Sequence, residues 1–138
     1  MNIYKSKIDS GIILLLVVSL LMPSMIFISE GTWEGLLMLS LVAIFIAYLM
    51  RQTKYTINDT TLVVKAGFMV NIKIAISDII SVTKTDSILS APANSITDRI
   101  EIKYQHTKSE KSVIISPKER DAFLNQLVKI NPDIQVVL

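Results

Sequence analysis

The chain has 138 residues, of which 51% are hydrophobic and 19% are charged, and its formal net charge is +2. This length leaves room for one small domain and an anchor, but not for two full globular domains. The small charge surplus argues against nucleic acid as a partner, and the absence of cysteine excludes a disulfide framework, a thiol nucleophile and a cysteine metal site.

Two apolar segments near the N-terminus predict transmembrane helices. Residues 11–28 contain no charged side chain, and residues 33–50 contain only Glu34. A hydrocarbon core of about 30 Å requires about 20 apolar helical residues, so each segment with its flanking residues is long enough to cross a bilayer. The connection over residues 29–32 is short, and the two helices are therefore expected to form an antiparallel hairpin.

The charges that flank these segments predict their orientation. Lys5 and Lys7 precede the first segment, Arg51 and Lys54 follow the second, and the connection carries no basic residue. The positive-inside rule then places both termini in the cytoplasm. The two helices make the lipid bilayer an expected partner of the chain. A cleavable signal peptide over residues 1–28 is the alternative, but no small-x-small cleavage site follows cleanly and the apolar segment exceeds a usual signal core.

The chain is expected to divide into a hairpin region (1–52) and a cytoplasmic β-rich domain (53–138). In the second part, apolar and polar residues alternate over short segments bounded by turn residues, a pattern typical of half-buried strands. We expect six or seven antiparallel strands in a meander, and residues 134–138 add a last short strand or pack on the closing helix. The strand-like segments are 54–57, 62–64, 70–76, 79–84, 99–104 and 113–115.

A single amphipathic helix is expected to close this sheet. Ser116, Pro117 and Glu119 match a capping box with proline at the first helical position. An apolar face follows on a helix that ends near residue 130, because Asn131 and Pro132 stop it. Its apolar members are Phe123, Leu124, Leu127 and Val128. We expect Phe123 and Leu127 to plug the open end of a curved sheet.

Short motifs occur in one order along nearly the whole chain. They are Tyr4–Asp9, Lys54–Ile57, Ile76–Ile79, Pro92–Ala93 leading to Asp98–Ile102, Ile115–Lys118, Phe123 and Asn131–Pro132. This order resembles that of the small bacterial PH-domain proteins called YyaB-like. The resemblance implies an α+β, PH-like fold, in which a bent antiparallel sheet or barrel follows the hairpin and is capped by a C-terminal helix. It implies no catalytic activity.

The residues provide no case for an enzyme. His106 is the single histidine and is expected in a solvated turn without a partner at ligand or base spacing. Arg99 and Glu101 are expected to share the outer face of a strand as a solvated ion pair. No glycine-rich phosphate loop and no zinc-ligand spacing is present. We therefore expect no catalytic residue, cofactor or metal.

The loop over residues 88–97 is the best candidate for an interaction site, because loops on a rigid sheet usually carry binding residues. Ser, Ala, Pro and Asn dominate it, and its polar groups are expected to be exposed donors and acceptors stiffened by one proline. The candidate residues are Ser90, Pro92, Asn94, Ser95, Asp98 and Arg99. A plain connection between strands is the alternative.

Two functions are consistent with these features. The first is a membrane-anchored, non-enzymatic binding module that recognises a peptide, another membrane protein or a lipid head group. A head group is the weakest of these, because Lys65, Lys73 and Lys84 are spread over different strands. The second is an immunity protein against a membrane-active bacteriocin-type peptide. A third function, an envelope enzyme that uses residues 98–101, is disfavoured because the sequence offers no catalytic site geometry there.

Overall fold

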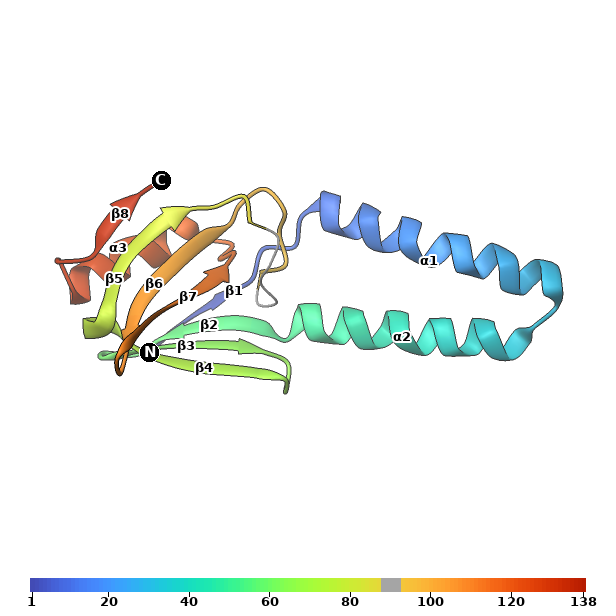
Figure 1. Ribbon diagram of the computed structural model, residues 1–138, viewed down its shortest axis with the longest axis horizontal. Coiled ribbons are helices and arrows are strands. Elements are labelled where there is room, and N and C mark those ends of the chain that lie inside the picture. Colours follow the sequence, from blue (N-terminus) through green and yellow to red (C-terminus); the bar gives the residue numbers. More distant parts are fainter. Residues whose placement is uncertain (88–92) are drawn as a thin grey trace.

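The computed structural model describes residues 1–87 and 93–138. A long helical hairpin extends from one end of a β-rich domain (Figure 1). The elements are, in chain order, β1 (Asn2–Lys5), α1 (Ser10–Glu30), α2 (Trp33–Arg51), β2 (Thr53–Ile57), β3 (Thr61–Ala66), β4 (Val70–Ala75), the 3-10 helix η1 (Ile76–Asp78), β5 (Ile79–Lys84), β6 (Ile100–His106), β7 (Ser109–Ile115), α3 (Arg120–Ile130) and β8 (Gln135–Val137).

The hairpin consists of two helices that are long and apolar enough to cross a membrane. Neither α1 nor α2 contains a buried residue, and large apolar side chains are exposed along both helices. Gly31 ends α1 with a φ of 67°, a left-handed conformation that glycine adopts without a Cβ clash. The helices approach closely beside this turn, because a Cβ on Gly35 would lie 2.6 Å from the Phe27 ring.

The described strands form two four-stranded sheets with the orders β1-β2-β3-β4 and β7-β6-β5-β8. Neighbouring strands pair antiparallel, apart from β8, which runs parallel to β5. The structure thus confirms an α+β fold with a helical hairpin, antiparallel sheets and a C-terminal helix. The expected single meander is wrong in two respects, since the strands divide into two sheets and β8 returns parallel to β5.

The strand β1 is the element that the sequence did not predict. Its residues pair with β2 in the register Asn2–Ile57 to Lys5–Lys54, so residues 2–5 of the expected hairpin region belong to the same sheet as β2. The helical hairpin is therefore inserted between two strands that are hydrogen-bonded neighbours. Four residues with no alternation of burial leave too short a pattern for a strand to be read from sequence.

The core lies between the two sheets and α3, and Phe123 of α3 is one of its largest fully buried side chains. Phe123 and Leu127 are both fully buried. The Phe123 ring makes edge-on contacts with Tyr4 of β1, at a centroid distance of 5.3 Å, and with Tyr55 of β2, at 6.4 Å. The expectation that Phe123 and Leu127 are the buried side chains of the closing helix is confirmed.

The prediction of a capping box at the start of α3 is wrong. The helix begins at Arg120, and its cap residue Glu119 makes no side-chain hydrogen bond to the helix. Ser116 is buried, and its hydroxyl accepts a hydrogen bond from the Asn94 amide at 3.0 Å instead. Pro117 forms an isolated bridge with Ser6. The Ser116 hydroxyl, which the local pattern assigned to the first turn of the helix, therefore bonds to a residue that is distant in sequence.

Truncation of the Phe123 side chain is expected to destabilise the domain strongly. Phe123→Ala removes a fully buried ring, so the free energy of unfolding should fall by about 3 to 5 kcal/mol. Asn125→Ala is the matched control, because Asn125 is exposed on the same helix. Thermal unfolding of the full chain in detergent measures both, and equal melting temperatures would contradict this account of the core.

Candidate functional site

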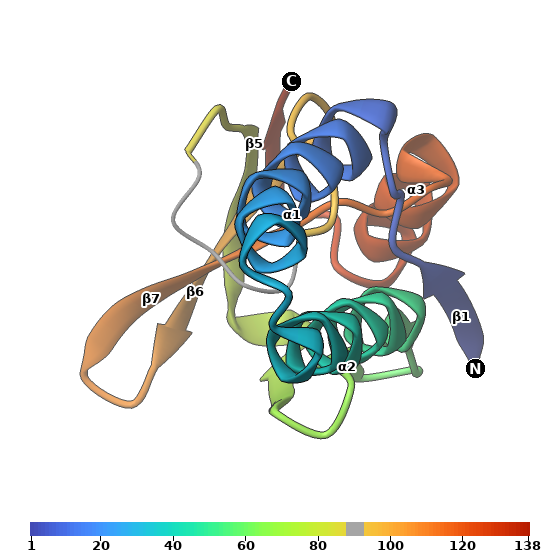
Figure 2. The ribbon, with the colours of Figure 1, turned by 90° about the vertical axis from the view of Figure 1, so that its right-hand side faces the viewer.

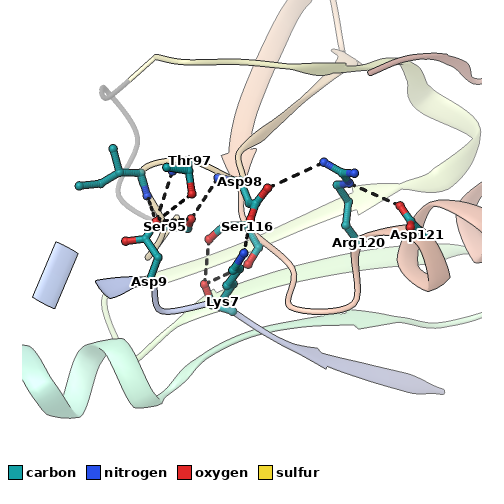
Figure 3. Close-up of polar contacts among 10 residues, drawn as sticks. Lys7, Asp9, Ser95, Thr97, Asp98, Ser116, Arg120 and Asp121 are labelled. Carbon is teal, nitrogen blue, oxygen red and sulfur yellow. Dashed lines mark hydrogen bonds and ion pairs between the residues drawn. The ribbon is translucent and has the colours of Figure 1, made fainter. Parts of the chain in front are cut away.

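Three connections meet where the hairpin joins the sheets, and together we call them the junction. They are residues 6–9 between β1 and α1, residues 93–99 before β6, and residues 116–119 between β7 and α3 (Figure 3). Backbone hydrogen bonds join the third connection to the first and to the end of β1. The Lys7 amide donates to the Ser116 carbonyl at 2.6 Å, and the Lys118 amide donates to the carbonyl of Lys5 in β1 at 2.9 Å.

The Asp9 carboxylate accepts hydrogen bonds from both α1 and the loop before β6. Its Oδ1 accepts from the Ile12 amide at 2.9 Å and so caps α1. Its Oδ2 accepts from the Ser95 hydroxyl and the Ile96 amide, both at 2.6 Å, and from the Thr97 amide at 3.3 Å. Burial by itself would raise the pKa of Asp9, but these hydrogen bonds outweigh it and hold that pKa well below its usual range. The ionised carboxylate thus ties the first turn of α1 to the loop.

A second set of charges lies on the outer side of the junction. Lys7 forms a salt bridge with Asp98, and the Arg120 guanidinium lies 4.0 Å from the other Asp98 oxygen. Arg120 also contacts Asp121 at 3.5 Å. The hydrogen bond from Lys7, with the positive charges of Lys7 and Arg120, lowers the pKa of Asp98 against the opposing effect of its partial burial. The start of α3 is therefore joined to the segment that precedes α1.

Beneath these charges lies a buried hydroxyl cluster. The Tyr55 hydroxyl donates to Ser6 Oγ at 2.9 Å and accepts from the Ser116 amide at 3.2 Å, and the two serine hydroxyls lie 3.1 Å apart. Burial raises the pKa of Tyr55 above its ordinary value. The cluster connects β2, the β1–α1 connection and the β7–α3 connection through one side chain.

Arg99 spans the ends of the loop that the sequence singled out. It is buried, its Nε donates to the Ser95 carbonyl, and its Nη1 donates to the Ser87 carbonyl at 2.7 Å. The expected exposed ion pair between Arg99 and Glu101 is wrong. Strand alternation does not apply to Arg99, because β6 begins one residue later at Ile100.

The expectation of exposed hydrogen-bonding groups is also wrong for Asn94 and Ser95. Their exposed fractions are 7% and 0%, respectively. Besides the contacts given above, Asn94 Nδ2 donates to the Met50 carbonyl at the end of α2, at 3.0 Å. Small polar side chains can be buried where hydrogen-bond partners are present. For Asn94 and Ser95 these partners belong to other parts of the chain. Of the other candidates, Ser90 and Pro92 lie outside the described residues.

The sequence did not identify three residues of the junction, Lys7, Asp9 and Arg120, as candidate site residues. For Asp9 a signal existed, since an aspartate directly before an apolar run is a helix N-cap pattern. Lys7 and Arg120 gave no local signal, because their common partner Asp98 is distant in sequence from Lys7 and belongs to an irregular loop.

A groove of about 380 Å³ opens on the outer side of the junction. Its charged residues alternate in sign, three cations with three carboxylates, and Lys118 and Glu119 are exposed in it. Within residues 1–87 and 93–138, no group of three His, Asp or Glu side chains is arranged to hold a metal ion. The groove is lined by Lys7, Asp98, Pro117, Lys118, Glu119, Arg120, Asp121 and Ala122.

The fold and the junction define a PH-like domain that carries an apolar helical hairpin between its first two strands. The family model described as Bacterial PH domain matches residues 53–131, more than half of the chain, and the chain belongs to this family. Its members are, in general, binding modules without catalytic activity. No curated protein and no solved structure matches the chain. The strand β1 and the hairpin lie outside the matched residues.

Loss of the Ser116 hydroxyl is expected to destabilise the domain through the junction and not through a helix cap. Ser116→Ala leaves the buried Asn94 amide without its acceptor, which should lower the free energy of unfolding by about 1 to 3 kcal/mol. Ser112→Ala, at an exposed position of β7, is the control. Amide hydrogen exchange distinguishes the two mechanisms: faster exchange at Asn94 supports the junction, and faster exchange confined to the first turn of α3 contradicts it.

The Asp9 carboxylate is expected to stabilise the fold at neutral pH. Asp9→Asn should lower the free energy of unfolding by about 1.5 to 3 kcal/mol, because charged acceptors make the stronger hydrogen bonds. Since folding lowers this pKa, the contribution is complete above the unfolded value of about 3.9 and is lost as the pH falls toward the folded value.

The difference in stability between wild type and Asp9→Asn should therefore be constant from about pH 5 to pH 8 and shrink below about pH 4. Thermal unfolding across this range measures it, with Asp133→Asn, at an exposed site, as the control. A difference that grows on acidification would show that the sign of the pKa shift is wrong.

Proposed function

We propose that this chain is a membrane-anchored, non-enzymatic interaction protein, with its PH-like domain held against the inner face of a cell membrane. The observation that carries the proposal is the insertion of the hairpin between the paired strands β1 and β2. Both ends of the hairpin are fixed to one sheet, and Asp9 ties the start of α1 to the loop before β6. The domain is thus attached rigidly and not through a flexible linker.

The arrangement of the termini supports the proposed orientation. Because β1 and β2 are neighbours in one sheet, the N-terminus and the domain lie at the same end of the hairpin (Figure 1). Two apolar spans return the chain to the side on which it began, and Lys5, Lys7, Arg51 and Lys54 cluster at that end. The positive-inside rule favours the cytoplasm for this end. The YyaB-like resemblance is consistent with the same arrangement.

The groove at the junction is the proposed binding surface, and a protein segment is its proposed partner. Lys7, Lys118 and Arg120 are balanced by an equal number of carboxylates in the groove. A polyphosphorylated head group would require an excess of cations, whereas a peptide with charges of both signs finds complementary partners there. A cytoplasmic segment of another membrane protein would meet the groove at the height of the membrane surface.

A second candidate, immunity against a membrane-active bacteriocin-type peptide, is favoured by one feature of the hairpin. At their domain ends, α1 and α2 enclose an apolar hollow of about 290 Å³, lined among others by Leu16, Leu20 and Ala43. An apolar peptide helix could contact this hollow from within the bilayer. Expression in a sensitive strain, followed by challenge with such peptides, tests this role, and unchanged tolerance would contradict it.

Single cysteines test the anchored binding module, because the natural chain contains none. Thr32→Cys, between the helices, should react with a membrane-impermeant maleimide in intact cells. Lys118→Cys in the groove and Lys108→Cys in the distal β6–β7 turn should react only after the cells are opened. Reaction of Lys118→Cys in intact cells would contradict the orientation.

The same variants test for a partner. In opened native membranes, Lys118→Cys should react several-fold more slowly than in the purified protein, because a bound segment covers the groove. Lys108→Cys is exposed and should react at the same rate in both preparations. Equal rates for Lys118→Cys would contradict a partner in the groove.

A further inference from the structure

The turn between β3 and β4 presents two neighbouring apolar side chains at the surface. Phe68 is 72% exposed and Met69 is 66% exposed. Turns in water usually contain Gly, Pro, Asn, Asp or Ser, and adjacent large apolar residues at such a tip leave apolar surface uncovered by the domain.

This turn lies directly beside α2. The ring of Phe68 is 6.1 Å from the ring of Phe45. Gly67 has a φ of 56°, a conformation that L side chains rarely adopt, and a Cβ there would come within 2.5 Å of Leu49 Cδ2, so the backbone of the turn packs closely against the Leu49 side chain of α2. In Figures 1 and 2 the turn reaches the domain end of α2 from below.

The position of Phe45 gives the depth that the turn reaches. Phe45 lies six residues before Arg51, which ends α2. At a rise of 1.5 Å per residue, this is about 9 Å along the helix axis. Phe68 thus stands at the level of the apolar part of α2, whereas the cations Arg51 and Lys65 are exposed closer to the domain.

A similar contact is found beside α1. Ile96 is 37% exposed, and its Cδ1 would lie 3.5 Å from a Cβ on Gly11, in the first turn of that helix. Both helices therefore have apolar side chains of the domain next to them at the end where they join it. At a membrane interface, apolar side chains reach the hydrocarbon region and cations lie at the level of the head groups. The apolar turn and the cations closer to the domain match this order.

We propose that the β3–β4 turn, residues 67–69, inserts into the lipid leaflet from which α2 emerges. The occupant of this apolar surface is the head-group and upper acyl region of the bilayer, which is continuous with the lipid around Phe45. The insertion fixes the tilt of the domain, since α1, α2 and the turn then enter the membrane at three separate points. This inference rests on the proposed function, because it requires α1 and α2 to span the bilayer.

Tryptophan fluorescence in lipid vesicles tests the insertion. The full chain with Trp33→Phe has no tryptophan, so Phe68→Trp provides a single reporter. In vesicles of phosphatidylcholine and phosphatidylglycerol, lipids brominated near the head-group end of the acyl chain should reduce its emission roughly two-fold. Lys108→Trp, in the exposed turn at the far end of the domain, should retain its emission (Figure 1).

Two further reporters make the outcome decisive. Met69→Trp repeats the measurement at the neighbouring exposed position, in case Phe68→Trp disturbs the contact with Phe45. Phe45→Trp reports whether α2 is in the bilayer at all. Quenching at positions 45, 68 and 69 supports the inference. Quenching at position 45 alone overturns the inference but not the proposed anchor. The exposed turn would then be a surface for a protein partner. Absence of quenching at all three overturns both.

Discussion

The pairing of β1 with β2 is the constraint on which the rest of the structure depends. These strands are neighbours in one sheet although two long helices separate them in the chain. The sheet can close only when α1 leaves and α2 returns at the same edge, so an antiparallel helical hairpin is a geometric requirement of the domain. Conversely, a hairpin whose ends are held by strand pairing cannot swing freely relative to the sheets.

The junction provides the polar groups that hold this arrangement. The segment from Ser6 to Asp9 passes from a strand to a helix, and irregular backbone of this kind leaves amides and carbonyls that need partners. Asp9 provides acceptors to α1 and to the loop before β6, while Ser116 provides an acceptor to the same loop. The consequence is that α1, the loop and the start of α3 are fixed relative to one another.

This rigidity bears directly on the proposed function. A PH-like domain on a flexible tether would sample many orientations, and each binding event would have to select among them. Here the groove beside Lys7 and Arg120 and the apolar β3–β4 turn keep fixed positions relative to the helices. An interaction at the membrane surface therefore requires little reorientation of the domain.

The sequence by itself determined the elements whose signal is periodic and local. Two apolar stretches of helical length predicted the hairpin, alternation predicted most of the strands, and the apolar face around Phe123 predicted the closing helix and its buried side chains. Each of these rests on the side chains within one element and on their distance from water. Tertiary structure decided the junction, because its partners are far apart in the chain: Asp9 and Ser95 are separated by 86 positions. Ser116 could cap a helix or accept from Asn94, and Ser95 could face solvent or Asp9. Local pattern cannot distinguish such choices, since a hydroxyl bonds to whichever partner the folded backbone brings within reach.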